Sequence, residues 1–279
     1  MSGRPGRLGV GIIGAGKVGP ILGAALAGAG HAIVGISAIS QASQDRAEAI
    51  LPAVPILTVP EIVERSELVI LAVPDAQLES LVVGLAATGT WRPGQLVLHT
   101  SARFGTGVLA PAFAGGAIPL AIHPAMTFTG TSIDIARLAD SYFAVTAPTP
   151  VLPIGQALVV EMGGEPVIIA EADRRTYAEA VETATAFSTS IVEQATNLLQ
   201  GIGIERPGAV IAPLIRSAME IALARTNPDT LNLAVLADLI DQGDGFGSNQ
   251  TERPGLRDPD RPDDDDGGSV PGWIEPEDS

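Results

Sequence analysis

The chain has 279 residues, enough for one large domain or two modest ones with a buried core. Hydrophobic residues make up 46% and charged residues 17%, which excludes a largely disordered protein. The absence of cysteine excludes disulfides, thiolate metal sites and a cysteine nucleophile. The formal net charge of -16 argues against nucleic acid as a partner, because a phosphate backbone requires a basic surface.

At the N-terminus, Arg4 and Arg7 precede an apolar run, as in a signal peptide, but glycines and Lys17 break that run. The chain has no uninterrupted apolar stretch of about 18 residues, so we predict no membrane span. We expect a cytoplasmic protein with a small-molecule substrate.

Residues 8–13 (LGVGII) are predicted to form a buried strand, followed by the turn GAGKVG, an Ala/Leu-rich helix over 20–30 and a second strand over 31–37. This order, within about 30 residues, is the context that the dinucleotide fingerprint GxGxxG requires. The sequence therefore predicts a dinucleotide-binding turn.

The three glycines of this turn have separate predicted roles. Gly14 permits the tight turn, Gly16 leaves room for a pyrophosphate, and Gly19 lets the helix pack closely on the strand. The helix N-terminus offers free N–H groups and a partial positive charge to the phosphates. The turn also contributes three residues to the predicted cofactor site: Ala15, Lys17 and Val18. Lys17, the only lysine, lies either near a phosphate or simply in solvent.

The end of the second strand favours NADP over NAD. An NAD site usually has an acidic residue there for the ribose hydroxyls, whereas this chain has Ser37 and no Asp or Glu before Asp45. Small hydroxyls and Arg46 suit a 2′-phosphate, although an ordinary polar loop would look the same. Val73 and Pro74, at the end of the strand predicted over 67–73, are expected against the ribose and nicotinamide.

Further strands are predicted over 95–100, 117–122, 142–147 and 165–170, with helices over 76–87 and 153–164. Asp75 is expected to cap the first of these helices. The predicted fold class is α/β: a doubly wound, mainly parallel Rossmann sheet over residues 1–170, followed by a small all-helical C-terminal domain.

Ser101 and His123 each lie just past the C-terminal end of a predicted strand. Ligands of open α/β sheets bind at these strand ends, so both residues are candidates for the rim where the nicotinamide would lie. Hydride transfer needs a proton partner, and histidine titrates near neutral pH. We therefore predict His123 as proton donor or acceptor and Ser101 as a substrate-orienting group, against the alternative that both hold local loops.

Three other polar groups have structural explanations at least as good. His99 lies inside its strand and is predicted to be a satisfied core histidine. His31 lies at a helix-to-strand turn. Arg103 could receive a substrate carboxylate, but a solvated loop arginine is the simpler interpretation.

The second domain (171–240) is predicted to contain helices over 171–200, 207–225 and 229–240, with a kink at Pro213. Three helices of small residues make a thin core on their own, so we predict a homodimer through them. Residues 241–279 hold twelve acidic and three basic residues and are predicted to form a disordered acidic tail. Its Asp263–Asp266 run is interpreted as solvated rather than metal-binding, and no metal site is predicted.

GAGKVG, LAVPD, HTSxxxG and HPAMTFTGT, in this order, resemble a bacterial family in which a Rossmann-like NADP-binding domain precedes a helical domain of unknown function. The resemblance covers roughly residues 8–225. It extends more distantly to pyrroline-5-carboxylate reductase, prephenate dehydrogenase and ketopantoate reductase, and it implies NADP binding and reduction or oxidation of a small carbon acid. Prephenate dehydrogenases also place a serine and a His-Pro pair after successive strands, as at Ser101 and His123.

The chain departs from this family pattern in three places. Ala102 replaces the usual glycine after the serine. Residues 186–190 (AFSTS) lack the Asn of many relatives, with Ser188 or Thr189 as candidate substitutes, and residues 226–240 lack a Gly-Pro and Arg-Gly-Asp segment.

The leading hypothesis is therefore an NADP-dependent oxidoreductase acting on a small carbonyl, hydroxyl or imine acid. The alternatives are a non-catalytic NADP(H) sensor or scaffold, and a flavin or sugar-nucleotide ligand at the same fingerprint.

Overall fold

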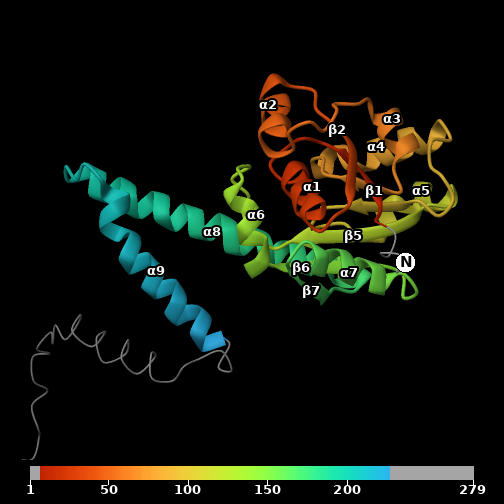
Figure 1. Ribbon diagram of the computed structural model, residues 1–279. Coiled ribbons are helices and arrows are strands. Elements are labelled where there is room, and N and C mark those ends of the chain that lie inside the picture. Colours follow the sequence, from red (N-terminus) through yellow and green to blue (C-terminus); the bar gives the residue numbers. More distant parts are fainter. Residues whose placement is uncertain (1–6, 227–279) are drawn as a thin grey trace, which may run out of the picture. The chain divides into compact units, whose positions relative to one another are not determined.

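The computed structural model describes residues 7–226, and the chain divides into two compact units at Leu198 and Leu199, each described separately (Figure 1). The long helix α8 (Arg174–Gly201) falls mostly within the first unit, whereas the predicted domain boundary followed the last strand. The predicted helix over 229–240 and the predicted acidic tail lie outside the described residues.

A seven-stranded sheet forms the centre of the first unit, in the order β2-β1-β3-β4-β5-β6-β7. All neighbouring strands are parallel except β5 and β6, which run antiparallel. The predicted mainly parallel sheet is therefore confirmed. The strands are β1 (Gly9–Ile13), β2 (Ala32–Ser37), β3 (Leu68–Leu71), β4 (Leu96–His99), β5 (Ile118–Pro124), β6 (Tyr142–Thr146) and β7 (Glu165–Ile168).

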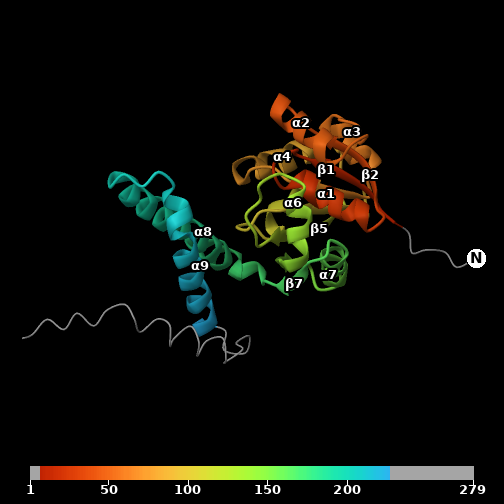
Figure 2. The ribbon, with the colours of Figure 1, turned by 60° about the vertical axis from the view of Figure 1, so that its left-hand side comes forward.

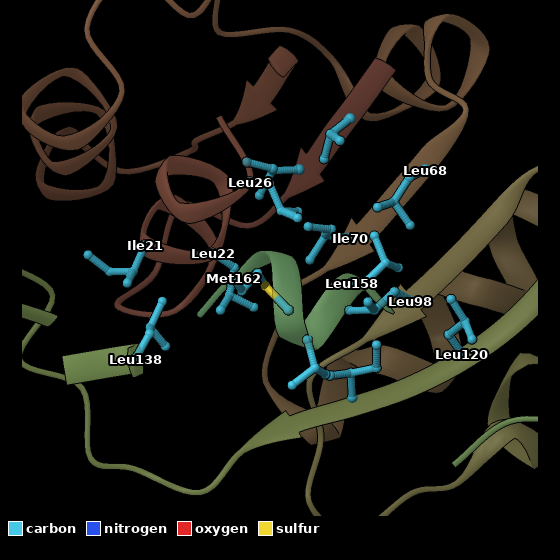
Figure 3. Close-up of a cluster of buried hydrophobic side chains, with 14 of the residues drawn as sticks. Ile21, Leu22, Leu26, Leu68, Ile70, Leu98, Leu120, Leu138, Leu158 and Met162 are labelled. Atoms are coloured by element: carbon cyan, nitrogen blue, oxygen red, sulfur yellow. The ribbon is translucent and has the colours of Figure 1, made fainter. Parts of the chain in front are cut away.

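Helices cover both faces of this sheet (Figure 1 and Figure 2). Because successive strand side chains point to opposite faces, β3 sends Leu68 and Ile70 into one core and Val69 and Leu71 into the other. Helices α1 (Gly19–Gly28) and α7 (Leu152–Glu161) close the first core, which Figure 3 shows around Leu22, Leu26, Leu158 and Met162. Helices α3 (Val59–Arg65), α4 (Asp75–Ala87) and α5 (Ala110–Ala114) close the second.

Side-chain hydrogen bonds cap the first turns of two helices, α2 (Gln41–Ile50) and α3, and the predicted cap of α4 is corrected. Helix α2 begins after Ser40, whose side chain accepts a hydrogen bond from the Ser43 N–H. Helix α3 begins with a capping box, in which Thr58 and Glu61 each accept a hydrogen bond from the other's backbone N–H. The prediction that Asp75 caps α4 is wrong: Pro74 takes the cap position, and Asp75 stands in the first turn, where its charge favours the helix dipole.

The second unit contains α9 (Pro207–Thr226), with Pro213 inside it as predicted. Within residues 7–226, α9 is the one helix long and apolar enough to cross a membrane, with a mean hydropathy of 1.3. Length and composition carry little weight alone, because the core helix of a soluble protein passes the same test. The absence of a membrane span stays a prediction.

Candidate functional site

The turn after β1 faces a cavity of about 550 Å³ at the carboxyl ends of β1, β2 and β3. Strands β2 and β3 lie on opposite sides of β1, so this is the point where the strand order reverses and where ligands bind in open α/β sheets. Six of the predicted cofactor residues line the cavity, namely Gly14, Ala15, Gly16, Ser37, Val73 and Pro74. Lys17, Val18 and Gly19 belong to the same turn but do not line it, and neither do Ser101 and His123.

The glycines of the turn occupy three different environments. Gly14 has a φ of 108°, and a side chain there would overlap the carbonyl group of Ala72. A Cβ at Gly19 would overlap the carbonyl oxygen of Gly14, so its absence permits close packing of α1. A Cβ at Gly16 would meet no atom within 4 Å. Packing within the protein therefore does not require glycine at position 16. The open space beside its backbone fits a ligand that approaches closely.

The first turn of α1 is free to receive an anion. Val18 occupies the N-cap position and provides no side-chain acceptor, and Pro20 in the same turn has no N–H, so the donors left for a ligand are those of the other first-turn residues. The N-terminus of a helix without a side-chain cap offers both N–H donors and a partial positive charge to a phosphate. The residues present therefore fit a dinucleotide, with its pyrophosphate against residues 14–19.

The end of β2 is polar but carries no acidic side chain. Ser37 accepts a hydrogen bond from the Gly14 N–H at 3.0 Å, so this serine holds the glycine turn as well as lining the cavity. Ser40 and Ser43 line the same wall. Arg46 does not: its Nη1 donates to the carbonyl oxygen of Ala15 at 3.0 Å, so the predicted phosphate partner braces the glycine turn instead.

The HPAMTFTGT motif forms a braced loop beside the same turn. The buried carboxylate of Asp134 accepts hydrogen bonds from the N–H groups of Thr129 and Gly130, at 2.7 and 2.8 Å. A Cβ at Gly130 would come within 3.0 Å of the side chains of Arg46 and Lys17. Gly130 thus lets this loop approach the two cations nearest the glycine turn.

Ser101 is buried and holds its own loop. Its Oγ accepts hydrogen bonds from the N–H groups of Arg103 and Phe104, at 3.1 and 3.3 Å. The Nδ1 of His99 accepts from the Ser101 N–H, and its Nε2 lies 2.8 Å from the carbonyl oxygen of Gly105. Burial lowers the pKa of His99 to about 4, so it is the neutral, satisfied core histidine that the sequence predicts.

His123 lies at the end of β5, half-buried, and its ring pairs with Tyr177. The Nδ1 of His123 lies 2.8 Å from the hydroxyl oxygen of Tyr177, and the two rings meet edge to face at 5.6 Å. Burial, the Arg174 guanidinium and then His99 lower the pKa of His123 to about 4. The imidazole is therefore neutral at pH 7 and almost never carries an extra proton.

Arg174, the first residue of α8, is the largest fully buried side chain in the described part of the chain. Its Nη2 donates to the carbonyl oxygens of Ala121 and Ala144, at 2.7 and 3.1 Å, and its Nε donates to the hydroxyl of Thr146 at 2.7 Å. A weaker contact of 3.4 Å joins Nη1 to the Ser101 carbonyl. Burial lowers its pKa to about 10, so this guanidinium stays charged at pH 7.

Sequence reasoning missed Tyr177 and Arg174 as site residues. Both lie in the helix predicted over 171–200, and no motif in the sequence marks either of them. Their proximity to Ser101 and His123 depends on where α8 starts relative to β5 and β6, which no local pattern encodes. His31 is structural as predicted, with its Nε2 2.8 Å from Glu161. Thr189, a candidate substitute for the family Asn, donates to the Thr185 carbonyl of its own helix.

No group of three or more His, Asp or Glu side chains within residues 7–226 is arranged to hold a metal ion.

Two family models match the chain: a Rossmann-like domain over residues 2–124 and a domain of unknown function (DUF2520) over residues 141–232. No curated protein matches the chain in sequence.

Solved structures share the fold at low sequence identity. A candidate NADP oxidoreductase from Bacteroides fragilis is 19% identical, with a TM-score of 0.65 over 85% of this chain and 89% of its own. The pyrroline carboxylate reductase of Plasmodium falciparum, solved with NADP bound, is 12% identical, with a TM-score of 0.56 over 85% of this chain and 92% of its own. An imine reductase from Streptomyces aurantiacus is 18% identical, with a TM-score of 0.58 over 84% and 78%.

At these identities the likeness shows the fold alone. The two domain matches and the fold agree with the resemblance derived from the motifs: a Rossmann-like domain is followed in this chain by a match to DUF2520.

Proposed function

We propose that the protein is an NADP-dependent oxidoreductase that transfers hydride between the nicotinamide and a small carbonyl, hydroxyl or imine acid. The observation that carries this proposal is the cavity at the end of β1, with an open backbone at Gly16 and an uncapped α1 N-terminus. Structures named as NADP oxidoreductases or solved with NADP share the fold and support the same cofactor.

Within this proposal, each group near the rim of the sheet has a defined task. The bound nicotinamide cofactor supplies or accepts the hydride. His123 is neutral and half-buried, and it exchanges a proton with the substrate through its hydrogen bond to the Tyr177 hydroxyl. Ser101 keeps its hydroxyl hydrogen available to orient the substrate, because its oxygen acts only as an acceptor from Arg103 and Phe104.

The test is a turnover screen with the full chain. NADPH oxidation is followed at 340 nm with small carbonyl and cyclic imine compounds, each with and without a carboxylate. The proposal predicts turnover of at least one carboxylate-bearing compound. Binding of NADPH with no turnover across the panel would contradict it.

A second candidate is a protein that binds NADP(H) without catalysis, as a sensor or scaffold. It is favoured by the local hydrogen bonds of the Ser101 Oγ and the His123 Nδ1, and by the absence of both residues from the cavity lining. Its signature is NADPH binding that changes the oligomeric state while no compound is reduced.

Replacing Ser37 by aspartate is expected to reverse the cofactor preference. A carboxylate at the end of β2 repels a 2′-phosphate and accepts hydrogen bonds from the ribose hydroxyls of NAD. We expect NADP affinity to fall about 10-fold or more, a loss of about 1.4 kcal/mol, and NAD affinity to rise. Calorimetric titration of both cofactors measures this change.

The matched control is Ser80→Asp, which adds the same charge to the opposite wall of the cavity. It should weaken both cofactors to a similar, smaller degree. An equal loss of NADP binding in both variants would show that the end of β2 does not read the 2′-phosphate.

We also propose that the protein forms a homodimer through its C-terminal helices. Helix α8 leaves Phe187 and Ile191, one turn apart, 65% and 51% exposed. Burying each such side chain contributes about 1.5–3 kcal/mol. A second copy covers these side chains symmetrically, since the same face is present on both molecules.

The double variant Phe187→Ser with Ile191→Ser is expected to raise the dimer dissociation constant at least about 100-fold. Light scattering coupled to gel filtration then reports a monomer mass, whereas Glu193→Ser on the same helix keeps the dimer mass. A wild-type protein that is monomeric at high concentration would contradict the proposal.

A further inference from the structure

We propose that Tyr177 delivers the proton to the substrate, with His123 as the hydrogen-bond partner that replaces it. This inference rests on the proposed function and assigns its proton donor. The sequence predicts His123 for that role. In the structure, the Tyr177 hydroxyl is hydrogen-bonded to Nδ1 of His123, and within residues 7–226 the other ring nitrogen has no such partner.

The first turn of α8 presents Tyr177 and Arg174 on one face, because residues three apart on a helix are neighbours. Arg174 enters the sheet and contacts the carbonyl oxygens of Ala121 and Ala144, while Tyr177 extends to His123. Tyr177 is half-buried, and its hydroxyl oxygen is held 2.8 Å from Nδ1 of His123. Helix α8 therefore adds a proton-carrying group to the rim of the sheet.

His123 alone cannot serve as the resting acid at neutral pH. Arg174 and Tyr177 of α8 and His99 of β4 face its ring. Burial, Arg174 and His99 all lower the pKa of His123. With a pKa of about 4, roughly one molecule in a thousand carries the imidazolium at pH 7. Burial raises the pKa of Tyr177, so its phenol keeps its proton throughout the neutral range.

Arg174 makes proton donation by the phenol less costly. Its guanidinium lies 5.9 Å from the centre of the Tyr177 ring and is held by carbonyl and hydroxyl oxygens rather than by a carboxylate. Glu171, the carboxylate whose charge acts on Arg174, accepts hydrogen bonds from the N–H groups of Thr106 and Gly107 rather than from the guanidinium. A fixed, buried cation stabilises the negative charge that develops on the tyrosine oxygen during transfer.

In the reducing direction, the substrate carbon receives a hydride from a reduced nicotinamide, and the electron pair of its C=O or C=N bond moves onto oxygen or nitrogen. That atom bonds to the phenolic hydrogen of Tyr177, and the electrons of the broken O–H bond stay on the tyrosine oxygen. The tyrosine oxygen takes the hydrogen from Nδ1 of His123, whose Nε2 takes a proton from solvent.

The decisive variant is Tyr177→Phe in the full chain, because it keeps the ring against His123 and Arg174 and removes only the hydroxyl. NADPH affinity, measured by fluorescence titration, should be unchanged. The kcat for the best compound of the turnover screen should fall about 100- to 10,000-fold, the usual contribution of general acid catalysis. The control is Tyr142→Phe, because Tyr142 is the other tyrosine of the chain and is exposed. It should leave the NADPH affinity and the kcat unchanged.

The pH profile of the wild-type protein gives a reading that does not depend on any variant. A phenol donor predicts a kcat for reduction that is flat from about pH 5 to pH 9. An imidazolium donor predicts a tenfold fall for each pH unit above about 5, because the protonated form of His123 is lost there.

A flat profile with a large loss in Tyr177→Phe supports the inference. A falling profile, or a Tyr177→Phe variant with wild-type kcat, overturns it and leaves the proposed oxidoreductase intact. Saturable NADPH binding with no turnover of any compound by the wild-type protein overturns both.

Discussion

Replacing Gly16 by valine is expected to abolish NADPH binding without destabilising the protein. The backbone at Gly16 faces open space, and no atom would lie within 4 Å of a new Cβ. A branched side chain there fills the space that a pyrophosphate needs to reach the α1 N-terminus. Losing two charge-assisted hydrogen bonds, at about 1.5–3 kcal/mol each, weakens NADPH binding about 100-fold or more.

The matched control for this variant is Gly84→Val. Gly84 lies on α4, and a Cβ there also meets nothing within 4 Å, but it does not line the cavity. Fluorescence titration should find wild-type NADPH affinity in the control, and thermal unfolding should find Gly16→Val as stable as the wild type. Retained NADPH binding in Gly16→Val would place the cofactor elsewhere.

Replacing Arg174 by methionine is expected to cost about 3–5 kcal/mol of unfolding free energy. The guanidinium is fully buried and satisfies the carbonyl oxygens of Ala121 and Ala144 and the hydroxyl of Thr146. Methionine fills much of the volume but leaves these acceptors buried without a donor, at about 1–3 kcal/mol for each group. Such a loss is a large fraction of the stability of a typical domain.

Urea unfolding followed by circular dichroism measures this loss, with Arg175→Met as the control. Arg175 is the next residue of α8 and is exposed, so its replacement should change the unfolding free energy by less than about 0.5 kcal/mol. Equal effects of the two replacements would mean that the buried hydrogen bonds of Arg174 contribute little.

The sheet was predictable because each strand carries a short apolar run, and the central strands β3 and β4 are buried on both faces. Residues 67–73 illustrate this: alternate side chains of β3 enter the two cores, so the sequence is apolar without interruption. The antiparallel pairing of β5 with β6 was not predictable, because the residue pattern of a strand does not indicate the direction of its neighbour. The start of α3 could have been found, since Thr58 and Glu61 form the sequence signature of a capping box.

Two glycines of the turn have a geometric reason that the sequence pattern anticipates, whereas the pyrophosphate role of Gly16 stays a prediction. Gly14 and Gly19 are in close contact with backbone carbonyl groups, and Gly16 faces open space. An arginine after small hydroxyl residues suits a 2′-phosphate or an ordinary polar loop, and in the structure Arg46 donates to the Ala15 carbonyl. Tyr177 and His123 are 54 residues apart, and their contact follows only from the packing of α8 on the sheet.

The most direct test of the central claim is calorimetric titration of the full chain with NADP and, separately, with NAD. We predict one saturable site per chain, with NADP bound more tightly than NAD and its binding lost in Gly16→Val. Absence of NADP binding to the wild-type protein, or unchanged binding in Gly16→Val, would contradict the assignment of the β1 turn as the cofactor site.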